Sequence, residues 1–177
     1  MKRLIALVAL VLVVDAGVAA AQEHYKGALG FHTSDAPLGV RWWLSNKFAF
    51  DAGVGFGSQE FSTGPSTTVS VSNFTVDLGL PIMLRSWDKV HFAVRPGIGY
   101  HSQEVFGTSN NDITLTIAGE LEAEVFLADN VSISASHGIA FQNFDPADPT
   151  ESSTTDWGTT GANFTSLGFH VYLFGGQ

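Results

Sequence analysis

Three glutamates spaced two residues apart, Glu120, Glu122 and Glu124, are the residues whose type and spacing most suggest chemistry in this sequence. Alternate side chains of a β-strand point to the same face, so this spacing predicts a column of three carboxylates. Carboxylates that close repel one another unless cations lie between them. If the column lines a closed interior, it suits either a neutralised charge network or a narrow path for cations.

The same parity places several cations on the predicted interior face. We expect arginines to neutralise part of the acidic set, because unpaired charges in a narrow interior carry a large desolvation cost. The predicted network comprises Arg41, Asp51, Asp77, Arg85, Arg95, Glu120, Glu122 and Glu124. Parity adds Lys26, His32, His91 and His170 to this face. An exchange of partners by Arg41 or Arg95 would gate the alternative cation path.

Catalysis and metal binding find little support in the sequence. The only His-x-Ser, at His32 and Ser34, falls at the tip of the first predicted hairpin, and a lone pair lacks the orienting group that a catalytic site needs. The chain has no cysteine, and no short ligand motif joins His32 or His91 to the carboxylates. We therefore expect no enzyme, no catalytic residue, no cofactor and no metal site.

The elements that must position these residues are β-strands. Between Phe74 and Leu84 every second residue is apolar, and this period of two recurs along the chain. Short turns at 45–47, 86–89 and 128–130 alternate with longer polar loops at 58–67, 104–112 and 143–160, with a further short connection at 34–36. The predicted strands are residues 25–33, 37–44, 47–58, 68–86, 89–104, 112–127, 130–143 and 160–174.

This layout predicts an all-β fold, an antiparallel up-and-down transmembrane β-barrel of about eight strands. Several strands sustain their alternation over the roughly 9–11 residues that cross a bilayer at a tilt. Aromatic residues gather in two bands, as they do at membrane interfaces. The band near the short turns comprises Trp42, Trp43, Phe48, Trp87, Phe92, Phe126, Tyr172 and Phe174. The band near the long loops comprises Phe31, Phe56, Tyr100, Phe106, Phe141 and Phe164.

Residues 37–44 (PLGVRWWL) and 48–56 (FAFDAGVGF) resemble the opening hairpins of small porin-like outer-membrane barrels, which include the transmembrane domain of outer-membrane protein A and the opacity-type proteins. The last strand is similar to the family's C-terminal assembly signal at Ser166, Gly168, Val171, Leu173 and Phe174. The family usually ends in an aromatic residue, whereas Gly175-Gly176-Gln177 follow here. The resemblance implies the barrel-assembly machinery, outer-membrane lipids and lipopolysaccharide as partners.

Residues 1–21 read as a cleaved signal peptide. Lys2 and Arg3 precede an apolar run at 4–14, and Ala19-Ala20-Ala21 supplies a cleavage pattern. Residues 22–177 then form the barrel, exported to the outer membrane of a Gram-negative bacterium. Loss of Lys2, Arg3 and Asp15 changes the formal net charge from -9 to -10. So acidic a chain is a poor partner for nucleic acid, which requires clustered Lys and Arg.

The expected role is that of a monomeric outer-membrane barrel with a structural or loop-mediated function, and the acidic outer loops are the place for an unknown partner. The narrow cation-conducting pore is the first alternative. A secreted barrel of the lipocalin type, with its apolar face turned inward onto a small ligand, is the second. The polar face here is rich in Gly and poor in Lys, which is unusual for a surface in water.

Overall fold

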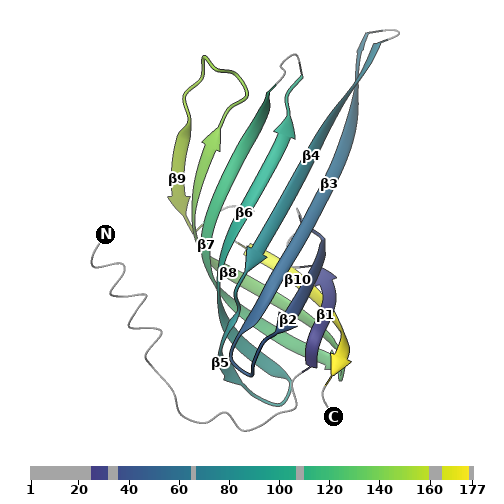
Figure 1. Ribbon diagram of the computed structural model, residues 1–177, viewed down its shortest axis with the longest axis vertical. Helices are drawn as coiled ribbons and strands as arrows, with labels where there is room; N and C mark the ends of the chain where they lie inside the picture. Colours follow the sequence, from purple (N-terminus) through teal and green to yellow (C-terminus); the bar gives the residue numbers. More distant parts are fainter. Residues whose placement is uncertain (1–24, 32–35, 65–66, 107–109, 160–164, 176–177) are drawn as a thin grey trace, which may run out of the picture.

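Ten β-strands and no helix make up the part of the chain that the structure describes, residues 25–31, 36–64, 67–106, 110–159 and 165–175. The structure is a computed structural model (Figure 1). The strands are β1 (Tyr25–Phe31), β2 (Leu38–Trp43), β3 (Ala49–Gly64), β4 (Thr67–Gly79), β5 (Ile82–Ser86), β6 (Val90–Glu104), β7 (Asn111–Ala128), β8 (Val131–Asp145), β9 (Thr154–Gly158) and β10 (Thr165–Gly175). No helix in these residues is long and apolar enough to cross a membrane.

The ten segments build eight barrel strands, because two of the eight are interrupted. β4 and β5 lie one after the other along β6. β9 and β10 likewise share β8, with β9 paired to residues 140–144 and β10 to residues 131–137. Antiparallel pairing of β1 with β10 closes the ring, so the predicted eight-stranded antiparallel barrel is confirmed.

The interruption between β4 and β5 lies at Leu80 and Pro81. Proline has no N–H to give to a neighbouring strand. The bonds on either side survive, since the Leu80 N–H donates to the Pro96 carbonyl and the Ala49 N–H to the Pro81 carbonyl, both at 2.9 Å. The predicted strand 68–86 is therefore two strands in line.

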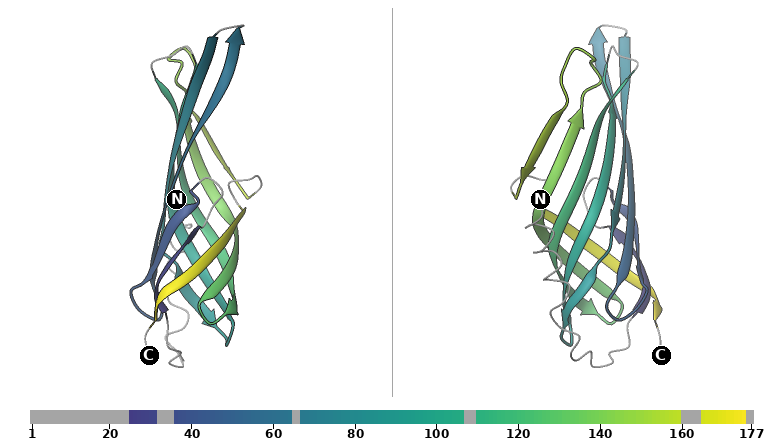
Figure 2. Two further views of the ribbon diagram at one scale, coloured as in Figure 1. Left: turned by 90° about the vertical axis from the view of Figure 1, so that its right-hand side faces the viewer. Right: turned by 60° about the vertical axis from the view of Figure 1, so that its left-hand side comes forward.

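The strands differ greatly in length, so the two ends of the barrel differ in form. β3 and β4 extend far beyond their neighbours at the end that carries the long connections, here the long-loop end (Figures 1 and 2). The prediction of a loop at 58–67 was wrong, because pairs such as Ser58 with Ser72 and Phe61 with Val69 continue the β3–β4 ladder into this segment. We call these paired segments, residues 55–64 and 67–75, the arm.

The barrel wall is apolar on its outside and polar on its inside. Ile117 and Leu121 of β7 are 64% and 63% exposed. Glu120, Glu122 and Glu124 alternate with them and are buried in the interior. The period of two in the sequence thus assigns each strand residue to one face of the wall. At the short-turn end the interior closes over a small apolar cluster of Ala28, Trp43, Ala49 and Tyr172, against which Met83 and Phe126 pack.

Candidate functional site

Arg41 of β2 is the centre of the charge network inside the barrel. Its Nε and Nη2 donate to the two carboxylate oxygens of Asp51 on the neighbouring β3, both at 2.8 Å. Its Nη1 and Nη2 donate to both oxygens of Glu122 across the barrel on β7, at 2.6 and 2.8 Å. Nη1 also reaches Glu124 at 3.3 Å. This guanidinium, 1% exposed, therefore joins opposite walls of the barrel.

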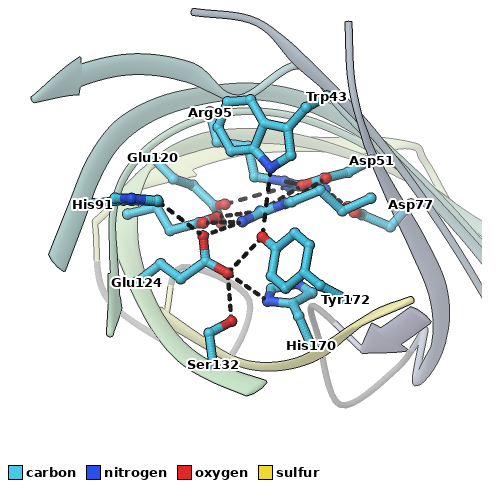
Figure 3. Close-up of polar contacts among 12 residues, drawn as sticks. Trp43, Asp51, Asp77, His91, Arg95, Glu120, Glu124, Ser132, His170 and Tyr172 are labelled. Atoms are coloured by element: carbon cyan, nitrogen blue, oxygen red, sulfur yellow. Dashed lines mark hydrogen bonds and ion pairs between the residues drawn. The ribbon is translucent and has the colours of Figure 1, made fainter. Parts of the chain in front are cut away.

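Arg95 of β6 forms a second centre, one layer nearer the long-loop end. Its guanidinium donates to Asp77 on β4, to Asp51 at 3.0 Å and to Glu120 at 3.4 Å (Figure 3). Gly79 makes room for it, because a Cβ there would lie 2.4 Å from the Arg95 guanidinium carbon. Asp51 accepts from both arginines and so links the two centres.

Glu124 collects hydrogen bonds at the short-turn end of the network. Its Oε1 accepts from the hydroxyl of Tyr172 at 2.8 Å and from Ser132, and Nδ1 of His170 lies 3.2 Å from it. His91 Nδ1 is 3.9 Å from Oε2. Figure 3 shows these groups converging on one carboxylate from several strands of the barrel. A buried carboxylate is stable only with such a full set of partners.

The interior carboxylates outnumber the interior guanidinium groups. Arg41 and Arg95 face Asp51, Asp77, Glu120, Glu122 and Glu124. The lumen therefore favours cations over anions electrostatically.

Packed side chains leave little free space across the network. The void between Arg95, Glu122 and Ser134 is too narrow for a water molecule. On the long-loop side of Arg95 the interior widens into a polar cavity of about 220 Å³. There Thr75 contacts His101 Nδ1 at 2.8 Å, which adds to its polar lining. The interior is thus a plugged barrel with a polar vestibule.

The structure brings together all but one of the residues predicted for the network. The exception is Arg85, whose placement in the lumen was wrong. A bulge between Met83 and Arg85 sets Arg85 opposite Phe92, an outward residue of β6, and so reverses the parity at the end of β5. Arg85 is exposed, with its guanidinium carbon 5.6 Å from the ring centre of Trp87. The side chains of Lys26 and His32 lie outside the described residues.

The predicted assembly signal lies in β10, at Ser166, Gly168, Val171, Leu173 and Phe174. Leu173 is on the outside of the wall and 53% exposed. Ser166 faces the interior, where its hydroxyl is 2.9 Å from that of Ser136. The side chain of Phe174 lies outside the described residues.

Sequence reasoning missed the part of the site that aromatic and hydroxyl groups supply. Trp43, Phe126 and Tyr172 were assigned to the aromatic band, yet all three pack inside the barrel. Strict alternation from the outward Trp42 already places Trp43 inside. The serines of β8, Ser132, Ser134 and Ser136, were also overlooked, although their spacing by two is the same signal as that of the glutamates.

His137 of β8 is a polar residue on the apolar face of the wall. The ladders of β8 with β7 and β10 are regular at this residue, and its side chain is exposed on the apolar outside. Its Nδ1 lies 2.7 Å from the Thr165 hydroxyl, which gives the polar ring a partner within the wall. Comparison of the chain with protein-family models, with curated proteins and with solved structures found no match.

Proposed function

We propose that this protein is an integral β-barrel of the bacterial outer membrane, whose barrel is a structural anchor and whose long-loop end makes the functional contacts. The observation that carries the proposal is the inverted polarity of the wall. Large apolar side chains such as Leu121, Ile98 and Leu167 are 63%, 55% and 69% exposed, whereas charged side chains fill the interior. A protein in water buries the first kind and exposes the second.

The ends of the apolar surface support a membrane position. Exposed aromatic residues lie towards the short-turn end, where Trp42, Phe48 and Trp87 are 46%, 48% and 50% exposed. At the other end of the surface Phe141 stacks with Trp157, ring centres 6.5 Å apart, and Trp157 is 70% exposed. Aromatic rings at two heights are typical of the two interfaces of a bilayer.

The plugged lumen supports a structural role for the barrel itself. Its salt bridges and hydrogen bonds tie β2, β3, β4, β6, β7 and β10 to one another. In this proposal residues 1–21 are removed on export, and β10 is read by the barrel-assembly machinery. The surrounding ligands are outer-membrane lipids and lipopolysaccharide, and the barrel is a monomer.

The polar interior argues against the lipocalin alternative. A barrel of that type needs an apolar cavity for its ligand. The cavity found here is lined by groups such as Asp77, Arg95 and Glu120, and the apolar residues of the strands face outward. An apolar ligand there would lie against charged and hydroxyl groups, which lose favourable solvation when apolar surface covers them.

The decisive experiment combines membrane fractionation with heat-modifiability on an SDS gel. The proposal expects recovery in the outer-membrane fraction and a band that shifts between unboiled and boiled samples. Recovery in the soluble periplasmic fraction without a shift would overturn it. A shift with recovery in the inner membrane would contradict the location and leave the barrel intact.

A narrow cation path is the second candidate, favoured by the excess of interior carboxylates over guanidinium groups. Because the network fills the lumen, conduction would require Arg41 or Arg95 to leave its partners. Single-channel recording in planar bilayers tests this function. Brief cation-selective openings that Glu122→Gln makes smaller or less selective would support it, whereas a silent bilayer with heat-shifted protein present would exclude it.

A further inference from the structure

The barrel wall is incomplete at the long-loop end. The pairing of β2 with β3 stops at Leu38 and Val54, although β3 continues to Gly64. Above this level, among the described residues, β3 pairs only with β4, and β9 pairs only with β8. Figure 1 shows β1, β2 and β10 confined to the lower part, while the upper part holds β3, β4, β6, β7, β8 and β9. The closed eight-stranded ring thus continues upward as a sheet with two edges.

The residues before β2 explain why its pairing ends there. Pro37 precedes β2, and proline is found in sheets chiefly at the first residue of a strand, at an edge or at a bulge. Ala36 is fully buried, and a Cβ on Gly53 would lie 3.0 Å from its carbonyl oxygen. The chain at Ala36 has therefore turned into the interior, away from the β3 edge.

The backbone groups on this edge are identifiable from the ladder. The Ala49 N–H donates to Pro81 on the β5 side, and Phe48 accepts from Leu44 on the β2 side. In an antiparallel strand the N–H and C=O of one residue both point to one neighbouring strand, and those of the next residue point to the other side. The even-numbered residues of β3 therefore present these groups to the edge beyond β2, at Phe56, Ser58, Glu60 and Ser62.

This edge lacks the usual protection against another strand. Edge strands in natural proteins are commonly blocked by Lys, Pro or a bulge. Residues 55–64 contain no Lys and no Pro, and Glu60 is their one charged residue. Their pairing with β4 is regular through Ser62. A long, flat, unblocked edge is a template for strand addition.

The polarity of each face of the arm determines which kind of side chain an added strand should present on that face. On the face continuous with the barrel interior, Phe61 pairs with Val69, and Val71 follows on β4. On the opposite face Phe56 pairs with Phe74 nearest the barrel, and the pairs beyond them are polar, with the Ser58 and Ser70 hydroxyls 2.7 Å apart. Beside residues 58–62, a complementary strand would alternate apolar residues facing inward with polar residues facing outward.

The charge of the long-loop end determines whether a binding partner should be cationic or anionic. Its carboxylates are Glu60, Glu104, Asp112, Asp145, Asp148, Glu151 and Asp156. No Lys or Arg occurs in residues 27–40, between Lys47 and Arg85 or after Arg95, so this end carries no Lys or Arg. A cationic partner is attracted, and a second copy of this acidic end is repelled.

We propose that the β3 edge of the arm binds a cationic β-hairpin of another polypeptide by strand addition. This deepens the loop-mediated role proposed above by naming its site and partner chemistry. Among the described residues the upper sheet has two strands fewer than the closed ring, so a hairpin is the complement that would approach β9 as well as β3. Backbone hydrogen bonds hold the first strand, Phe61 and Val69 contact its apolar side chains, and the carboxylates attract its basic ones.

A pair of variants at Glu60 tests the backbone bond separately from the charge. Glu60→Pro removes one edge-facing N–H without removing a bond to β4, and Glu60→Gln removes only the charge. The probe is a synthetic hairpin peptide, cyclised by a disulfide, with Val on its inward face and Lys on its outward face. Its affinity for the full-length barrel in nanodiscs should fall at least about tenfold in Glu60→Pro and less than about threefold in Glu60→Gln. Equal binding by Glu60→Pro and wild type would overturn strand addition.

Amide hydrogen exchange and two control peptides complete the test without any variant. The amides of Phe56, Ser58, Glu60 and Ser62 should exchange rapidly in the free protein and become protected with the probe. Amides already protected in the free protein would mean that the edge is covered, and would overturn the proposal. A backbone N-methylated probe and a Glu-for-Lys probe should both bind at least about tenfold more weakly. Failure of binding in a barrel that still shows its heat shift would contradict this inference and leave the membrane proposal standing.

Discussion

Arg41 meets three carboxylates at once, Asp51, Glu122 and Glu124, and donates five hydrogen bonds to them. Arg41→Met would leave these buried carboxylates short of a cation. Breaking a buried pair in this way typically costs about 3–5 kcal/mol. We therefore expect the midpoint of urea unfolding in lipid vesicles, followed by tryptophan fluorescence, to fall substantially.

Arg85→Met is the matched control for that measurement. Arg85 is exposed and its guanidinium lies against the ring of Trp87, so its loss should change stability by less than about 1 kcal/mol. Equal effects of the two substitutions would contradict the buried network. They would mean that the arginines act through total charge rather than through their partners.

Two glycines on adjacent strands provide a second matched pair of test and control substitutions. A Cβ on Gly138 of β8 would lie 2.1 Å from the carbonyl oxygen of Gly119 on β7. Gly138→Ala must therefore push the two strands apart, with an expected cost of about 1–3 kcal/mol. Gly119→Ala meets nothing within 4 Å and should be close to neutral in the same urea titration. A neutral Gly138→Ala would contradict the close approach of β7 and β8.

At the scale of the strand, the outward face of β7 distinguishes a bilayer from water. Ile117→Arg places a charge on the apolar belt, which costs about 2–4 kcal/mol near the middle of a membrane. On a protein in water the same exposed position would tolerate arginine. Thr68→Arg, exposed on the arm, is the control and should unfold like the wild type in vesicles. Equal stability of both variants would argue against a lipid-facing β7.

Strand faces followed from the sequence more reliably than strand ends. A period of two fixes which residues share a face, so Asp51, Asp77 and the glutamates of β7 were assigned correctly to the interior. It does not reveal where the ladder inserts a residue, which is why Arg85 was misplaced by the bulge. Strand ends depend on partners far away in the chain. The arm resembled a loop because residues 62–68 are rich in Ser and Thr, and the pairs Ser62–Thr68 and Gly64–Thr67 carry no apolar side chain.

At the scale of the whole molecule, the two ends of the barrel differ in length, charge and connection. The short-turn end carries Lys47, Arg85 and Lys89, whereas the long-loop end carries carboxylates and no Lys or Arg. Short turns face the periplasm in outer-membrane barrels. In the proposed outer-membrane location, the arm and the acidic loops would point away from the cell, where a partner that never enters the periplasm can reach them.

This orientation is testable by labelling, because the chain contains no cysteine of its own. Asp148→Cys and Asp129→Cys replace the same residue type at exposed positions on opposite ends of the barrel. In intact cells a membrane-impermeant maleimide should label Asp148→Cys and spare Asp129→Cys, since the outer membrane separates the reagent from the turn at Asp129. Permeabilisation should make both reactive. Labelling of Asp129→Cys alone would mean that the barrel has the opposite orientation. Equal labelling of both variants in intact cells would mean that the protein does not span the outer membrane.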